Sequence, residues 1–189
     1  MPKVSIVIPV WGEYKKFLNN CLESVKRQTY KDYEVIVVEN KTDLPSARNE
    51  GICRATGEYI MPLDVDDELR ADYLEKTVGK GDIVTTAHFG AGNKKAIPVL
   101  EVNLADLKRH NVVIACSLFK KKVWEDIGGY DEKLTVGWED WDFWLRAMLK
   151  GYKIETVNEP LYHYKQRKGS MVTKMGDTNK IKQYILNKI

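Results

Sequence analysis

The chain has 189 residues, 43% of them hydrophobic, which suits one globular domain with a buried core. Its 30 basic and 27 acidic residues nearly cancel, so the charge does not argue for a nucleic-acid partner. Its apolar runs are far shorter than the ~20 residues of a membrane span, and the N-terminus shows no signal-peptide pattern. We therefore expect a cytoplasmic protein whose membrane contact, where it has any, is peripheral.

The cysteines limit the chemistry further. Cys21, Cys53 and Cys116 are odd in number, widely spaced and set in apolar surroundings. This pattern predicts buried free thiols in a reducing compartment rather than a disulfide framework. Their spacing does not match a zinc site either.

The first third of the chain alternates between apolar runs and helical patterns. Residues 4–9 and 33–38 are β-branched apolar runs typical of strands buried on both faces of a parallel sheet. Hydrophobic residues at helical spacing over 14–28 predict a helix between them. This order implies a right-handed crossover and a parallel pair of strands. A helix over 45–55 and a strand over 59–63 follow.

The rest of the chain is expected to be more mixed. Its predicted elements are a helix over 69–78, strands over 83–86, 97–102 and 113–119, helices over 121–127 and 139–150, strands over 153–157 and 161–164, and an amphipathic helix over 179–187. Together the two parts predict an α/β sandwich with a mostly parallel central sheet and a mixed C-terminal half.

Three segments follow predicted strands directly, namely 9–11, 39–40 and 64–67. In open α/β sheets, ligands bind beyond the carboxyl ends of the strands. We therefore expect these three segments to meet on one rim of the sheet.

The last of these segments, Asp64-Val65-Asp66-Asp67, places three carboxylates within four residues. Like charges about 5 Å apart repel by roughly 3 kcal/mol per pair at an effective dielectric of ~20, and a divalent cation turns this repulsion into binding. Hard oxygen ligands suit Mn²⁺ or Mg²⁺, which complete their shells with substrate phosphates. The alternative is that Asp67 caps a helix beginning near Glu68 and the other two acids are solvated, which explains one Asp well and three poorly.

A resemblance makes this interpretation specific. The segments VSIVIPVWGE, VIVVEN, SARNEGICRATGEYIMPLDVDDEL, GGYDE, GWEDWDFWLRA and PLYHY resemble successive motifs of family 2 glycosyltransferases with the GT-A fold, and they cover nearly the whole chain. The resemblance implies a GT-A-type αβα sandwich over residues 1–165, with a nucleotide-binding half over 1–67 and an acceptor-binding half over 68–165. Residues 166–189 would add a basic loop and a C-terminal helix.

The resemblance implies a metal-dependent inverting glycosyltransferase with Mn²⁺ or Mg²⁺ as cofactor. Its donor would be a nucleoside-diphosphate sugar, with a UDP-sugar favoured, and its acceptor a hydroxyl of a glycan, a polysaccharide or a lipid-linked sugar. Two alternatives stay open. The first is a sugar nucleotidyltransferase. Such enzymes usually have a glycine-rich loop after the first strand, and the segment PVWGEYKK has one glycine there. A non-catalytic domain that binds nucleotide or glycan is the other.

Carried over by residue, the resemblance implies that Asp64 faces the ribose or sugar and that Asp66 is the chief metal ligand. His163 would be a further metal ligand beside Asp66 and Asp64, although a histidine near a strand end is more often simply packed. The nucleotide-sugar pocket is expected to be lined by Pro9, Val10, Trp11, Glu13, Glu39, Arg48, Asp64 and Val65. Glu13 equally suits a helix start, and Arg48 a surface salt bridge.

This chain departs from the family pattern in two places. Glu39 stands where the family usually has the Asp that binds the base. Only residues 40–45 separate this strand from the helix that carries Arg48, whereas family members generally have a further helix and strand there. We therefore expect the sheet to lack an edge strand, which leaves one wall of the nucleoside pocket more open or formed by other residues.

The acids Glu139, Asp140 and Asp142 begin a helix, where the helix dipole favours each by ~0.3–1 kcal/mol, so they do not require a catalytic role. In the resembled family the second acid of the Glu-Asp pair is the general base. This role falls on Asp140, with Glu139 in reserve. The expected acceptor-binding residues are Gly129, Tyr130 and Trp138, while a plain helix cap would explain Gly128 equally well.

Lys165, Arg167, Lys168 and Gly169 open a basic stretch after the last strand. Most such stretches are solvated loops, but this one could close over the diphosphate and neutralise the leaving group. His88 and His110 have no comparable context and are expected at the surface.

Overall fold

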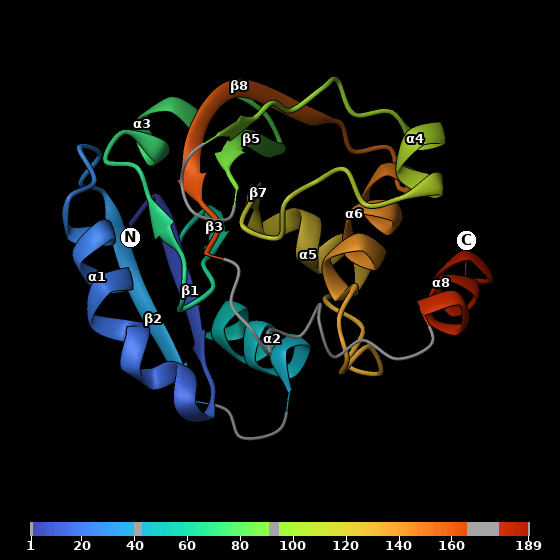
Figure 1. The fold of residues 1–189 in the computed structure, drawn as a ribbon, viewed down its shortest axis with the longest axis horizontal. Coiled ribbons are helices and arrows are strands. Elements are labelled where there is room, and N and C mark those ends of the chain that lie inside the picture. The colour runs from blue at the N-terminus through green and yellow to red at the C-terminus, as the bar shows by residue number, and fades with distance from the viewer. Residues whose placement is uncertain (1, 40–42, 91–94, 166–177, 189) are drawn as a thin grey trace.

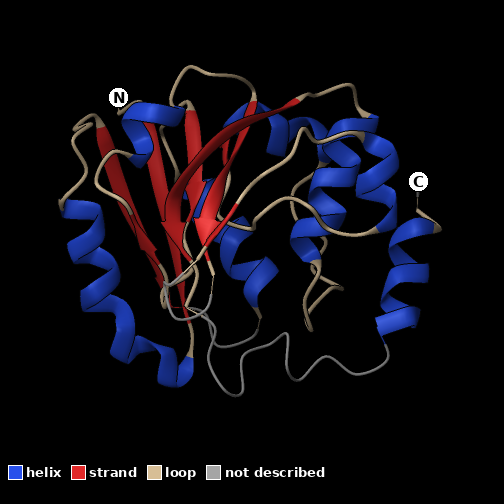
Figure 2. Ribbon diagram, turned by 45° about the horizontal axis from the view of Figure 1, so that its top comes forward, coloured by secondary structure: helices blue, strands red, loops and turns tan. Residues whose placement is uncertain are grey.

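The computed structural model describes residues 2–39, 43–90, 95–165 and 178–188. Helices flank a central sheet (Figures 1 and 2). The elements, in chain order, are β1 (Val4–Val10), the 3-10 helix η1 (Gly12–Phe17), α1 (Leu18–Lys26), β2 (Tyr33–Glu39), α2 (Leu44–Arg54), β3 (Tyr59–Pro62), β4 (Glu68–Leu69), α3 (Tyr73–Thr77), β5 (Ile83–Phe89), β6 (Ala96–Ile97), α4 (Leu104–Arg109), β7 (Leu118–Lys120), α5 (Lys121–Ile127), α6 (Glu139–Leu149), β8 (Ile154–His163) and α8 (Thr178–Leu186).

The strands form one mixed sheet in the order β2-β1-β3-β7-β5-β8-β4, with β6 beside β5. In the N-terminal half, β1 pairs in parallel with β2 and β3, as its continuous apolar sequence predicts. In the C-terminal half, β5 and β8 are parallel, whereas β7 and β4 run antiparallel to their neighbours. Among the described strands β2 forms an edge of the sheet, in line with the short connection that follows it.

Alternating side chains of β1 supply two cores, one on each face of the sheet. On one face, Ile6 and Ile8 pack with residues of α1 and α3. On the other, Val7 packs with α2 and belongs to a larger core that includes α5, α6 and α8. Every residue of β1 is buried, so β1 lies in the middle of the sandwich. The acidic segment follows the neighbouring strand β3.

The strand β8 determines how the C-terminal half closes on the N-terminal half. The two strands predicted over 153–164 are one curved strand that arches over the molecule (Figure 1). Its first part pairs with β5 and its last residues pair with β4, so that Tyr162 lies opposite Leu69 and His163 opposite Glu68. This curvature places the end of β8 beside the acidic segment.

Three further predicted elements differ in the structure. The helix expected over 69–78 is reduced to α3, because Leu69 pairs with β8. The strand expected over 97–102 is limited to β6, and an α-helix that the sequence analysis missed, α4, follows it, capped by Asn103. The strand expected over 113–119 pairs only from Leu118, because the residues before it line a cleft.

The helix predicted over 179–187 is present as α8 and is anchored on α6. Ile185 is fully buried, and the ammonium of Lys188 contacts the carboxylates of Asp131 and Asp142. Asp142, also fully buried, accepts a second hydrogen bond from Arg146 at 2.7 Å. The third acid of the segment Glu139–Asp142 therefore serves packing between helices.

Cys21 and Cys116 are buried free thiols as predicted, but Cys53 is exposed, because it lies on the outer face of α2. None of the helices in the described ranges combines the length and apolar character that crossing a membrane requires.

Candidate active site

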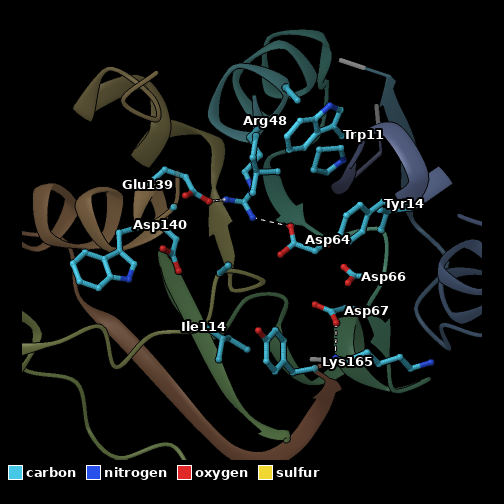
Figure 3. Close-up of a pocket in the computed structure, with 18 of the residues that line it drawn as sticks. Trp11, Tyr14, Arg48, Asp64, Asp66, Asp67, Ile114, Glu139, Asp140 and Lys165 are labelled. Atoms are coloured by element: carbon cyan, nitrogen blue, oxygen red, sulfur yellow. Dashed lines mark hydrogen bonds and ion pairs between the residues drawn. The ribbon is translucent and has the colours of Figure 1, made fainter. Parts of the chain in front are cut away.

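A cleft of about 470 Å³ opens beyond the C-terminal ends of β1 and β3. Figure 3 shows Asp64, Asp66 and Asp67 on one side of it, Glu139 and Asp140 on the other, and Arg48 between them. Ten of the residues expected from the sequence line this cleft: Pro9, Val10, Trp11, Arg48, Asp64, Val65, Asp66, Trp138, Glu139 and Asp140. Two distant segments of the chain thus share one cavity.

The three acids after β3 have different environments. Asp64 and Asp66 are partly exposed and line the cleft. Asp67 is 2% exposed, and its carboxylate accepts hydrogen bonds from the Tyr162 hydroxyl and, at 2.7 Å, from the backbone N–H of Lys165. Burial raises the pKa of Asp67 to about 8. The short segment is therefore fixed to the end of β8 by its last acid, while its first two acids face the cavity.

The donor atoms at this rim fit a hard divalent cation. Ligand atoms of Asp64, Asp67 and Cys116 lie within 4.8 Å of one another, and the Asp66 carboxylate borders the same cleft. Burial raises the pKa of the Cys116 thiol, which contacts the Asp64 N–H and the Tyr162 hydroxyl. A protonated thiol is not a ligand for Mn²⁺ or Mg²⁺, so the carboxylates are the residues that suit such an ion.

Arg48 joins the two sides of the cleft. It is 1% exposed; one guanidinium nitrogen lies 2.7 Å from Asp64 and another donates to Glu139. The positive charge also lies over the Tyr130 ring, 5.4 Å from its centroid. The sequence predicts Arg48 near the nucleotide or in a surface salt bridge; in the structure it lines the cleft and forms a buried salt bridge, because α2 directs it inward between two acids.

Asp140 faces the cavity from the first turn of α6. The side-chain amide of Asn111 donates to it at 2.9 Å, and the Trp141 N–H donates at 2.8 Å. Burial raises the pKa of Asp140, an effect that the nearby Arg48 opposes. Trp138, the N-cap of α6, adopts a left-handed backbone with φ of 64°, a strained geometry that is common at functional sites.

Glu139 is 4% exposed and is held by Arg48, so its contacts are those of a structural carboxylate. Burial raises the pKa of Glu139 to about 7, and Arg48 opposes this shift. Both acids line the cleft, but Glu139 is buried against Arg48, whereas Asp140 is partly exposed to the cavity.

Five expected residues are not brought to the cleft. Glu13 lies exposed on η1, and Glu39 pairs with Lys15 at 2.8 Å. Tyr130 is buried against Phe143, and the Gly129 carbonyl accepts from Arg146. These four residues are exposed, form a surface ion pair or pack locally away from the cleft.

The fifth, His163, lies between Tyr162 and Tyr164 on β8. Because side chains alternate along a strand, the two tyrosines line the cleft and the histidine is directed away from it. Its ring stacks on Phe89 at 4.6 Å, and its Nδ1 is buried without a hydrogen-bond partner among the described residues.

The cleft also has lining residues that the sequence did not assign to the site. They include Tyr14, Asp43, Leu44, His88, Asn111, Ile114, Tyr162 and Tyr164. His88, expected at the surface, is half-buried because β5 carries it to the cavity. The aromatic residues flanking His163 and the Asn before a predicted strand were signals for three of these, Tyr162, Tyr164 and Asn111. Of the basic stretch, only Lys165 is described; Arg167, Lys168 and Gly169 lie outside the described residues.

Comparisons with known proteins agree with this architecture. The family model for glycosyl transferase family 2 matches residues 5–43 and 39–82, and that for the N-terminal domain of galactosyltransferase matches 105–169. An uncharacterised glycosyltransferase of Methanocaldococcus jannaschii is 26% identical, with 87% of this chain and 71% of that protein covered. The uncharacterised glycosyltransferase YwdF of Bacillus subtilis is 29% identical, with 82% and 71% covered.

Solved structures share the fold. TarS of S. aureus in complex with UDP-GlcNAc superposes with a TM-score of 0.77 at 16% identity, covering 97% of this chain and 64% of TarS. The mannosyltransferase PcManGT from Pyrobaculum calidifontis, in complex with GDP-Man and Mn²⁺, gives 0.67 at 17% identity, covering 92% and 59%. The chain thus spans about three fifths of the length of these crystallised proteins.

The mixed sheet and its flanking helices form a GT-A fold, with the cleft at the strand ends. The chain resembles glycosyltransferase family 2 over residues 5–82 and its curated relatives are glycosyltransferases, so we identify it as a glycosyltransferase of the family 2 type.

Proposed function

We propose that this chain moves a sugar from a nucleoside-diphosphate sugar to an acceptor hydroxyl in a metal-dependent reaction that inverts the anomeric carbon. The observation that carries the proposal is that Asp140 faces Asp64 and Asp66 across one cleft (Figure 3). The complexes of TarS with UDP-GlcNAc and of PcManGT with GDP-Man and Mn²⁺ support a donor and a cofactor of these kinds.

On the donor side, Asp66 and Asp64 would hold Mn²⁺ or Mg²⁺. When bound, this ion offsets the negative charge of the departing diphosphate. Arg48 keeps Asp64 in place with a 2.7 Å contact and is itself held by Glu139, so the donor side is fixed relative to α6 before substrates arrive. Trp11, directly after β1, and Tyr14, on η1, border the part of the cleft assigned to the nucleoside.

On the acceptor side, Asp140 is the general base. It takes the proton of the acceptor hydroxyl while that oxygen forms a bond to the anomeric carbon and the bond from this carbon to the diphosphate oxygen breaks. Burial raises the pKa of Asp140 and so makes its carboxylate a stronger base than an exposed Asp. Asn111 fixes the carboxylate orientation through its 2.9 Å hydrogen bond.

Trp138 and Ile114 line the cleft beside Asp140 and form the acceptor end in this proposal. An aromatic ring and an apolar side chain suit the face of a sugar ring, as in a glycan or a lipid-linked sugar. In this assignment residues up to 67 supply the donor half and residues 68–165 the acceptor half. The site is proposed to work in the cytoplasm, at or near a membrane surface when the acceptor is lipid-linked.

The test uses the full chain with Mn²⁺, a panel of sugar nucleotides and a panel of sugar acceptors. Release of nucleoside diphosphate should depend on acceptor, and the transferred linkage should show inverted configuration by NMR. Asp140→Asn should lower turnover by at least about a hundredfold while nucleotide affinity changes little. Normal turnover in this variant, or nucleotide exchange that does not depend on acceptor, would contradict the assignment of Asp140 as the general base of sugar transfer.

A further inference from the structure

The strand β2 forms an edge of the sheet, and no other described strand covers its outer side. Its seven residues pair with β1 in continuous register, and they include no proline or glycine. Proteins usually protect a sheet edge with a proline, a bulge or a charge directed across it, because open backbone groups can pair with another strand. The carboxylate of Glu34, in the first half of β2, accepts hydrogen bonds from Ser5 and Thr56, so it is directed towards β1. The middle of the β2 edge therefore lacks these protections.

The register with β1 fixes which backbone groups of β2 point outward. The Val4 N–H donates to the Asp32 carbonyl at 3.2 Å, and Val4 is the register partner of Tyr33. In a parallel pair, alternate residues direct both their N–H and C=O groups to the same neighbour. The even-numbered residues of β2 therefore bond to β1, and the odd-numbered residues Tyr33, Val35 and Val37 direct their N–H and C=O groups to the open edge.

The same three residues form an apolar row on one face of β2. The helix α1 lies on this face and α2 on the other (Figure 1). Tyr33 and Val37 pack partly against the core beneath α1, whereas Val35 between them is 37% exposed. A strand paired with this edge would cover Val35 and satisfy the outward backbone groups.

We propose that the open edge of β2 pairs with β2 of a second copy of this chain, in an antiparallel ladder about a two-fold axis at Val35. A two-fold interface brings the same surface of both subunits together, and two antiparallel strands meet in this way. Val35 then exchanges both backbone hydrogen bonds with the partner's Val35. In this register Tyr33 lies opposite the partner's Val37 on the same face, and such pairs of an aromatic and a β-branched residue stabilise a ladder.

The charges at the two ends of the row are self-complementary in this register. Lys31 and Glu39 flank the row and are exposed, and the register places Lys31 opposite the partner's Glu39 at both ends. Opposite charges directly across a ladder stabilise it. The Lys31 ammonium, which has three donors, donates to the Lys26 carbonyl at 3.3 Å, and one Glu39 oxygen lies 2.8 Å from Lys15. Both groups can therefore bind a second partner, and a second copy supplies the matching charge at each end.

This dimer keeps the two clefts apart. Each cleft lies beyond the C-terminal ends of β1 and β3, and β1 runs parallel to both β2 and β3. Antiparallel pairing of the two β2 strands therefore places the clefts at opposite ends of the joined sheet. The interface is thus separate from the proposed function and does not depend on it.

Sedimentation velocity of the full chain, from about 1 to 100 μM, measures the association. The wild-type protein should form dimers in this range. Val35→Lys places two like charges opposite each other at the axis and should raise the dissociation constant of the dimer by at least about tenfold. The matched control is Leu100→Lys in the connection between β6 and α4, where Leu100 is 78% exposed, and it should leave the constant unchanged.

Charge reversal tests the register. Lys31→Glu alone and Glu39→Lys alone each place like charges opposite each other at both ends, so each variant should dimerise at least about threefold more weakly than the wild type. In an equal mixture, one variant is acidic and the other basic at both ends, so the two should form a heterodimer of about wild-type affinity. Labelling one variant with a fluorophore distinguishes the heterodimer from the homodimers.

Three results would overturn the proposal. The first is a wild-type chain that stays monomeric over the whole range. The second is a dimer that Val35→Lys leaves intact, since another surface would then hold it. The third is a mixture of Lys31→Glu and Glu39→Lys that associates no more tightly than either variant alone, provided that circular dichroism shows both variants to be folded.

Discussion

The side-chain amide of Asn111 donates a 2.9 Å hydrogen bond to Oδ2 of Asp140. The other oxygen of this carboxylate accepts from the Trp141 N–H, so both of its oxygens have a fixed protein partner. Burial raises the pKa of Asp140, while Arg48 and these two hydrogen bonds lower it in part. Asn111, in the loop before β7, therefore sets both the orientation and the basicity of the Asp140 carboxylate on α6.

Replacing Asn111 with Ala should move the acidic limb of the kcat/KM profile to higher pH. A general base works only when deprotonated, so the rate falls as the pH drops through the pKa of Asp140. Removing a hydrogen bond that lowers this pKa raises it, and the loss of rate then begins at a higher pH. The measurement is kcat/KM against pH for wild type and variant, with nucleotide affinity followed over the same range. An unshifted limb with uniformly reduced rate would mean that Asn111 acts on geometry alone.

A second prediction concerns Arg48. Arg48→Met should lower the free energy of unfolding by about 3–5 kcal/mol, because it leaves the buried Glu139 and the half-buried Asp64 without their cation. Urea denaturation measures the change. The matched control is Arg54→Met on the same helix, where the partner Glu50 is 3.6 Å away and both side chains are 54% exposed, so the expected effect stays within about 0.5 kcal/mol.

Adding Glu139→Gln to Arg48→Met should recover part of the lost stability, since one of the two unpaired charges is removed. Equal effects of Arg48→Met and Arg54→Met would contradict a buried pairing role. If Arg48→Met keeps its stability and loses only nucleotide affinity, Arg48 contacts the nucleotide, as the sequence predicted.

The sequence predicted the N-terminal half of the sheet because its strands are continuous apolar runs that can only be buried on both faces. The same logic placed Asp64, Asp66 and Val10 at one rim, since the ends of parallel strands meet there. Arg48 could not be assigned in this way. Its role depends on Glu139, 91 residues further along the chain, and local patterns do not encode contacts at such separations.

The triplet Tyr162-His163-Tyr164 shows a second limit of sequence patterns. Because both neighbours of His163 are tyrosines, the alternation along β8 gives no indication of which set faces the cavity. The pairing of His163 with Glu68 in β4 decides it, and this pairing follows from the curvature of β8. Metal coordination by His163 therefore stays a prediction to be tested.

A third prediction follows for the metal. Asp66→Asn should weaken Mn²⁺ affinity in the presence of nucleotide by at least about tenfold, because it removes a charged ligand from the rim. His163→Phe should change it by less than about twofold, since Phe can keep the stack on Phe89. Electron paramagnetic resonance of free Mn²⁺ reports both values. A loss in His163→Phe as large as that in Asp66→Asn would establish His163 as a ligand.

The last prediction uses two adjacent glycines after α5. Gly128 and Gly129 both have φ of 78°, where an Ala side chain is strained by about 1–2 kcal/mol. A Cβ at Gly128 would meet no atom within 4 Å, whereas one at Gly129 would lie 2.9 Å from Asn49 Oδ1 and 3.0 Å from Trp124 Nε1. Asn49 Oδ1 accepts hydrogen bonds from Trp124 and from the Tyr130 N–H, so the added methyl group would disturb this junction.

Gly129→Ala should therefore lower the free energy of unfolding by about 1–3 kcal/mol more than Gly128→Ala, which shares the backbone strain without the collision. Thermal and urea unfolding of the two variants give the difference directly. If both variants are equally stable but Gly129→Ala raises the KM for the acceptor, then Gly129 serves the acceptor site as the sequence predicted. If the stability difference appears and the acceptor KM stays constant, Gly129 is required because α2 packs too closely for any side chain.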